Sequence, residues 1–174
     1  MLGVFENFPS VIQAYAQFSY GFSPAKLQVL VVEAMGRLNS QKENLPPEGS
    51  ALGLTTAYEV GVAESNSFIF LREEEVERIK RHLSKGKNDV LDFFVHIVYR
   101  HNKSGGKSAP LWGDFNFVRF LFQERGSLEI QVSHFKGTRR LPLDELIERL
   151  VAKINEEAEK RRLKPLKLIE LKSL

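Results

Sequence analysis

The sequence predicts an α+β protein with a mainly antiparallel sheet of four to five strands and helices packed on one face. Two segments, near the start and near the end of the chain, carry long apolar stripes at helical spacing. Three segments in the second half alternate their side chains with the period of two that is typical of strands. Short turn signals between strands favour antiparallel neighbours.

Length and composition indicate a single domain over residues 1–174, because 43% hydrophobic and 27% charged residues are ordinary for a globular protein. No apolar run approaches the roughly 20 residues that a membrane span needs. The first residues have neither a basic region nor a cleavage-site pattern, so we expect a cytoplasmic protein without a membrane partner.

Cysteine is absent, which excludes disulfides, thiolate metal sites and cysteine nucleophiles together. The stability of the fold must therefore come from packing. A surface rich in Lys and Glu, with two Met, is typical of proteins from thermophiles.

The first elements are predicted to be helices. Residues 10–18 place Val11, Ile12 and Tyr15 at helical spacing. A second helix over 23–38 begins with Ser23 and Pro24, a typical cap and first-turn pair, and carries one continuous apolar stripe.

A surface loop is predicted over 39–53, which has two prolines and two glycines and little periodicity. Residues 54–62 and 68–71 then form a hairpin. Residues 73–84 form a short helix with acidic residues at its start and basic residues at its end, which complements the helix dipole.

The second half is predicted to hold three strands, over residues 90–101, 112–123 and 128–135, followed by a long helix over 143–162. We expect that helix to cover one face of the sheet and to leave the other face open. The tail over 166–174 is either an edge strand or a contact with a second subunit.

The distribution of charge and of aromatic rings gives the functional prediction. Between Tyr99 and Arg140 eight Lys/Arg stand against three acidic residues, whereas residues 1–98 hold nine against twelve. Aromatic residues are interleaved with these cations. Phosphates need positive partners and unstacked bases need flat ones, so the segment predicts a protein that binds single-stranded DNA or RNA with little sequence preference.

We expect the rings to provide stacking surfaces on the open sheet face and the cations to follow the phosphates along its rim. The candidate binding residues are Tyr99, Arg100, Lys103, Lys107, Trp112, Phe115, Phe117, Arg119, Phe135, Lys136, Arg139 and Arg140. At least half of the listed rings should be interior, because thirteen Phe in a small domain must largely be buried.

The sequence matches no catalytic or metal-binding pattern completely, so we expect no enzyme, no cofactor and no metal site. Residues 103–108, KSGGKS, resemble a phosphate-binding loop, but a glycine is missing at His101 and a strand follows instead of a helix. His96 and His101 lie on opposite faces of one strand and cannot share a metal ion.

The sheet with aromatic and basic residues, the flanking helices and the absence of cysteine resemble the archaeal ThermoDBP-type single-stranded DNA-binding proteins. The resemblance is one of organisation over residues 90–162, and its nearest carriers are Trp112, Phe115, Phe117, Arg119 and the FKGTRR run over 135–140. It implies a fold with an apolar cleft edged by basic residues. Such proteins can dimerise through a C-terminal leucine zipper, whereas Pro165 interrupts the stripe here.

Two other classes of function stay open at this stage. A protein-interaction module, including a homodimer, would use the same exposed rings and the C-terminal tail. A small-ligand or nucleotide-processing enzyme would need a closed pocket that gathers His96, Asp92 or His101 beside a basic anchor. The surface position of the rings distinguishes the three classes.

Overall fold

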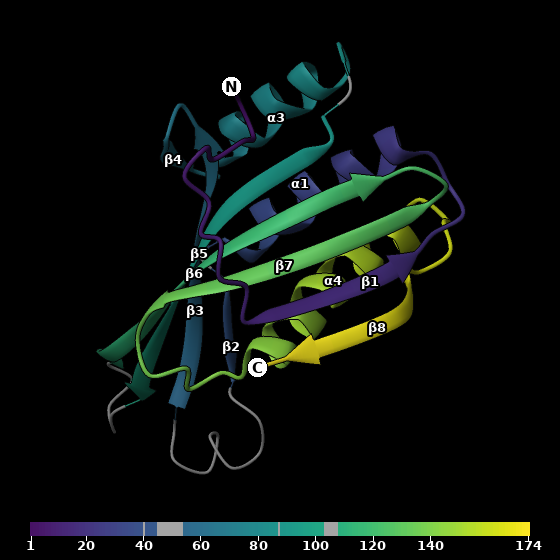
Figure 1. Cartoon of the computed structure of the whole chain (residues 1–174). Coiled ribbons are helices and arrows are strands. Elements are labelled where there is room, and N and C mark those ends of the chain that lie inside the picture. Colours follow the sequence, from purple (N-terminus) through teal and green to yellow (C-terminus); the bar gives the residue numbers. More distant parts are fainter. Residues whose placement is uncertain (40, 45–53, 87, 103–107) are drawn as a thin grey trace.

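The chain forms one antiparallel sheet with helices against one face (Figure 1). The computed structural model describes residues 1–39, 41–44, 54–86, 88–102 and 108–174. Within them the sheet has eight strands, in the order β2-β3-β5-β6-β7-β1-β8 with β4 paired to β3. The strands are β1 (Ala14–Ser19), β2 (Lys42–Asn44), β3 (Leu54–Glu64), β4 (Ser67–Phe70), β5 (Val90–Asn102), β6 (Ser108–Gln123), β7 (Ser127–Lys136) and β8 (Lys167–Ser173).

Three helices lie among the described residues: α1 (Pro24–Leu38), α3 (Glu73–Leu83) and α4 (Leu143–Lys160). In Figure 1, α1 and α4 lie behind the sheet, and α3 packs against α1. Ser23 caps α1, because its hydroxyl accepts a hydrogen bond from the Lys26 N–H at 3.3 Å. The apolar stripes of α1 and α4 are buried in the core that they share with the sheet.

The strands β1, β3, β5, β6 and β7 contribute alternate side chains to this core. On β5 the residues Leu91, Phe93, Val95, Ile97 and Tyr99 face the helices and are at most 1% exposed. Their neighbours in the chain point to the opposite face, which no helix of the described chain covers. We call that side of the sheet the open face.

The predictions of an α+β class, of an antiparallel sheet and of helices on one side are confirmed. The strand number was underestimated, because β1 and β2 were not predicted and β8 was only one of two alternatives for the tail. Residues 10–18 are not a helix: β1 begins at Ala14 and pairs with β7 and β8. The apolar spacing of this segment fits a helix, but the buried residues Ala14, Ala16 and Phe18 also alternate as in a strand. The segment forms a strand because β7 and β8 pair with its two edges.

The segment predicted as a surface loop, 39–53, contains the short strand β2, which pairs with β3. Residues 45–53 lie outside the described residues. The tail is an edge strand, since β8 pairs with β1 and ends the sheet. No helix in the described part of the chain is long and apolar enough to cross a membrane.

Residues 1–13 cross the open face before β1 begins (Figure 1). Backbone hydrogen bonds fix this segment at both ends: the Gly3 N–H donates to the Ala63 carbonyl, and the Gln13 N–H donates to Val132. The Asp92 N–H in turn donates to the carbonyl of Gly3. The open face is therefore partly covered by an extended segment rather than by a helix.

Helix α1 packs closely against α3 at Gly36. A Cβ atom there would lie 2.5 Å from Cγ2 of Val76, whose branched side chain has little rotational freedom. We predict that Gly36→Ala destabilises the fold by about 1–2 kcal/mol despite its better helix propensity. Urea denaturation measures this, and adding Val76→Ala should recover part of the loss. A Gly36→Ala protein as stable as the wild type would contradict the close approach.

Candidate functional site

Seven phenylalanines of the described chain touch one another on the open face, and we call them the aromatic patch. Phe117 of β6 is the centre, with ring centroids 5.4 Å from Phe5, 5.7 Å from Phe94 and 5.6 Å from Phe135. The patch comprises Phe5, Phe8, Phe68, Phe94, Phe115, Phe117 and Phe135. Rings from four strands and from the N-terminal segment thus form one continuous surface.

The patch is partly open to solvent. Phe135 is 67% exposed, and its neighbour Phe117 is half-buried. At the β4 side Phe70, 53% exposed, joins patch residues around a hollow of about 410 Å³. The described residues that line this hollow carry no charge; they are Phe5, Gly61, Asn66, Phe68, Phe70, Phe94 and Phe117.

A buried carboxylate holds the N-terminal segment on the patch. Asp92 is fully buried and accepts two hydrogen bonds from the Arg119 guanidinium, at 2.7 and 2.8 Å. It also accepts one from the Phe5 N–H at 2.8 Å. Arg119 donates further to the Phe5 carbonyl and lies 4.3 Å from the ring centroid of Phe8. One ion pair therefore positions two rings of the patch.

A second buried carboxylate shapes the loop after β7. Asp114 accepts hydrogen bonds from the backbone N–H groups of Arg139 and Arg140, at 2.8 and 3.0 Å, and from the Tyr99 hydroxyl at 2.6 Å. Gly137 is required here, because its φ is +116° and a Cβ would lie 2.2 Å from Asp114 Oδ1. Both arginines are exposed, and the Arg139 guanidinium donates to the Leu174 carbonyl at 3.5 Å.

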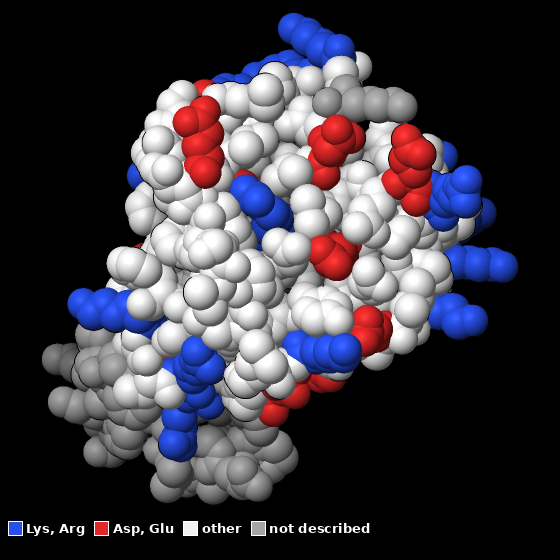
Figure 2. All heavy atoms as spheres, viewed as in Figure 1, with Lys and Arg blue, Asp and Glu red and all other residues white. Residues whose placement is uncertain are grey.

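Exposed cations adjoin the patch at this end. Lys136 pairs with Phe115 across β6 and β7, and residues 139 and 140 follow in the loop. Figure 2 shows the white middle of the open face with Lys and Arg side chains at its lower end, where the loop into α4 passes in Figure 1. Arg100 is half-buried, and its Nε has no hydrogen-bond partner in the described part of the chain.

Two of the twelve predicted site residues make internal contacts within the fold. Tyr99 faces the helices and is fully buried; its hydroxyl donates to Asp114 and accepts from the Leu141 N–H, so it cannot stack on a base. Burial and the Asp114 carboxylate raise the pKa of this phenol well above its usual value. Arg119 lies on the open face but is held by Asp92, so its charge is already compensated.

The other predicted residues fall into two groups. Phe115, Phe117, Phe135, Lys136 and Arg100 lie on the open face, and Arg139 and Arg140 are exposed in the loop that follows β7. Lys103, Lys107 and the side chain of Trp112 lie outside the described residues. More than half of the described candidate rings are not buried, contrary to the prediction that at least half are interior.

Four patch residues were not among the predicted binding residues: Phe5, Phe8, Phe68 and Phe94. Phe94 could have been found, because it alternates with the core residues of its strand. Nothing in the sequence relates Phe5 to Phe117, which are 112 positions apart. His96 was rejected as a metal ligand and stacks on Phe115 at 4.1 Å between ring centroids, with Nδ1 3.3 Å from Glu59.

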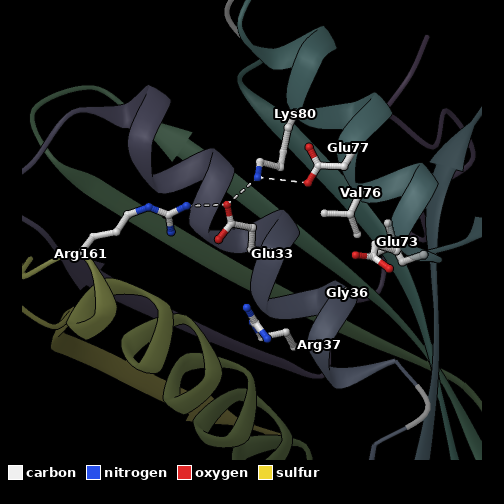
Figure 3. Close-up of a pocket in the computed structure, with 9 residues that line it drawn as sticks. Glu33, Gly36, Arg37, Glu73, Val76, Glu77, Lys80 and Arg161 are labelled. Atoms are coloured by element: carbon white, nitrogen blue, oxygen red, sulfur yellow. Dashed lines mark hydrogen bonds and ion pairs between the residues drawn. The ribbon is translucent and has the colours of Figure 1, made fainter.

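A second hollow, of about 500 Å³, lies between α1, α3 and the end of α4 (Figure 3). Its cations are all engaged: Lys80 and Arg161 both contact Glu33, at 2.9 and 2.5 Å, and Arg37 pairs with the buried Glu157. Because each of these cations is paired with a carboxylate, the hollow has no excess positive charge that would attract an anion. We interpret this hollow as an ion-pair network that joins the helices.

Among the described residues no group of three His, Asp or Glu could hold a metal ion. Comparisons with protein-family models, with curated proteins and with solved structures find no match. The resemblance to ThermoDBP-type proteins therefore stays a prediction from the arrangement of elements, aromatic residues and basic residues in the sequence.

The Asp92–Arg119 pair gives a stability prediction. Arg119→Met removes the cation but keeps much of the side-chain volume, leaving a buried carboxylate without its charged partner. We expect a loss of about 3 kcal/mol in the free energy of unfolding, measured by chemical denaturation. Lys136→Met, which replaces an exposed cation on the neighbouring strand, is the control and should change stability by less than about 0.5 kcal/mol. Equal stability of both variants would exclude the anchoring role.

The Glu33 network predicts a pH dependence. Burial acts to raise the pKa of Glu33, but the hydrogen bonds and charges of Arg161 and Lys80 outweigh it and hold the pKa below the usual 4.5. The network therefore stabilises the fold fully above about pH 4.5 and loses its contribution as the pH falls through the lowered pKa.

We predict that Glu33→Gln costs about 1 kcal/mol at pH 7. The difference in the free energy of unfolding between wild type and variant should become smaller as the pH falls below about 4. Chemical denaturation at a series of pH values measures this difference. A difference that does not change with pH would mean that packing, and not charge, accounts for the loss.

Proposed function

We propose that this protein binds single-stranded nucleic acid across its open face, with bases on the aromatic patch and phosphates on the cations of residues 136–140. The observation that carries the proposal is a continuous, partly exposed set of rings beside exposed Lys136, which pairs with Phe115 and is followed in the chain by exposed Arg139 and Arg140. Flat rings accept any unstacked base, and cations beside them accept the phosphates that connect successive bases.

Phe135 is the best placed ring for stacking. It is 67% exposed, extends the patch from Phe117 and is followed directly in the chain by Lys136. Rings deeper in the patch are half-buried and supply apolar support around it.

Single strands fit this arrangement better than duplexes, because stacked and paired bases do not offer their faces to rings on a sheet. Direct reading of base edges is not part of the proposal. We therefore expect similar affinity for different sequences and a strong dependence on salt.

The experiment is a fluorescence anisotropy titration of labelled single-stranded DNA and RNA, and of duplexes, at two salt concentrations. Arg139→Ala/Arg140→Ala should weaken binding to all sequences and lower the salt slope by about one per lost phosphate contact. The variant should fold normally, because Asp114 binds the backbone N–H groups of these residues and not their side chains.

The matched control is Arg81→Ala/Lys85→Ala, which removes two exposed cations at the end of α3 and so makes the same change in net charge. Phe135→Ala should cost about tenfold in affinity, and Phe135→Leu, which keeps an apolar side chain without a flat ring, should not restore it. The absence of salt-dependent binding, or equal effects of the arginine variant and its control, would contradict the proposal.

The uncharged hollow beside Phe70 favours a second candidate, a protein-interaction surface. An apolar side chain of a partner would fit between the rings that line it. Binding of this kind changes little with salt, so the same titration separates the two functions.

A further inference from the structure

The two edges of the sheet differ in what they offer to a partner. One edge of β3 carries the short strands β2 and β4, of three and four residues. The other edge is formed by β8, of seven residues, which pairs only with β1 within the described chain. A longer unpaired edge presents a row of free backbone donors and acceptors to another strand.

Exposed apolar side chains gather at the β8 edge. Leu168, Ile169 and Leu174 are 52%, 59% and 87% exposed. Ile169 is the extra residue of a bulge, because Gln17 pairs with Glu170 and Phe18 with Leu168. Charged residues alternate with these apolar ones, as Lys167, Glu170 and Lys172.

We propose that β8 pairs antiparallel with β8 of a second copy of this chain, around a two-fold axis at Leu171. This inference is independent of the proposed function. The pairing would join the two sheets edge to edge into one continuous sheet.

The direction of the backbone groups of β8 supports a two-fold axis at Leu171. The Leu174 N–H donates to the Gln13 carbonyl, so Leu174 directs its backbone groups toward β1. Successive residues of an antiparallel strand direct their backbone groups to alternate sides, which turns Ser173 and Leu171 outward. Leu171 can then exchange both hydrogen bonds with Leu171 of the partner subunit across the axis.

Charge complementarity selects the same register. A two-fold axis at Leu171 places Glu170 opposite the partner's Lys172, and Lys172 opposite the partner's Glu170. Moving the axis to Glu170 would instead place two carboxylates directly opposite one another, which destabilises a strand pair. The intramolecular pair of Glu170 and Lys172, 3.1 Å apart, already holds both side chains on one face.

The arrangement has a geometric consequence. An axis that relates edge-paired antiparallel strands is perpendicular to the sheet, so the two open faces lie on the same side of the joined sheet. The contact involves one short strand from each copy, which places it among small interfaces, and we expect a dissociation constant in the micromolar range, about 10 µM.

The test is sedimentation velocity on the full chain from about 1 to 200 µM, a range that brackets such an affinity. The wild type should pass from monomer to dimer. Glu170→Lys and Lys172→Glu alone should each dimerise about tenfold more weakly, because each puts like charges opposite one another twice. An equimolar mixture of the two variants should associate about as well as the wild type, since opposite charges then face each other again.

Lys164→Glu is the matched control, an exposed charge reversal before β8 that lies outside the pairing register and should leave dimerisation unchanged. Circular dichroism confirms that each variant keeps its fold. A wild type that stays monomeric over the whole range would overturn the proposal. So would variants that dimerise as well as the wild type, a mixture that gains nothing, or association that continues beyond a dimer.

Discussion

The arrangement of this protein depends on one constraint: its helices cover a single face of the sheet. Helices α1 and α4 bury alternate side chains of the strands in one core. The opposite face still carries large apolar rings, and exposed apolar surface of this extent costs free energy in water. Thirteen residues at the N-terminus relieve only part of that cost, so a patch of partly exposed phenylalanines is left on the surface.

Two buried carboxylates then fix the segments that lie at the two ends of the sheet. Asp92 binds Arg119 and the backbone of Phe5, and so fixes the extended segment on the sheet. Asp114 binds the backbone of residues 139 and 140, and so fixes the loop that follows β7. Both use charge-assisted hydrogen bonds in an environment without competing water, where such bonds are strong. In the loop, the contacts that maintain the fold are made by the main chain, which leaves the arginine side chains available for other contacts.

The separation of the two kinds of arginine is informative about basic segments in general. Arg119 and Arg140 belong to the same cation-rich stretch of sequence, yet one is an internal counter-ion and the other is exposed. A local excess of positive charge therefore overstates the charge that a partner can reach. The same holds for aromatic residues, since Tyr99 is sealed in the core and Phe135 is open to solvent.

Local periodicity in the sequence was enough to determine the three helices, the β3–β4 hairpin and the strands β5 to β7, because each pattern repeats within a few residues. It also determined that rings and cations share one segment. It could not determine β1, because the segment over 10–18 fits both periods until β7 and β8 pair with the two edges of the strand. Nor could it determine the aromatic patch, because Phe5 meets Phe117 only after the N-terminal segment is hydrogen-bonded across the sheet. Contacts between residues so far apart in the chain are set by tertiary packing, and no local pattern encodes them.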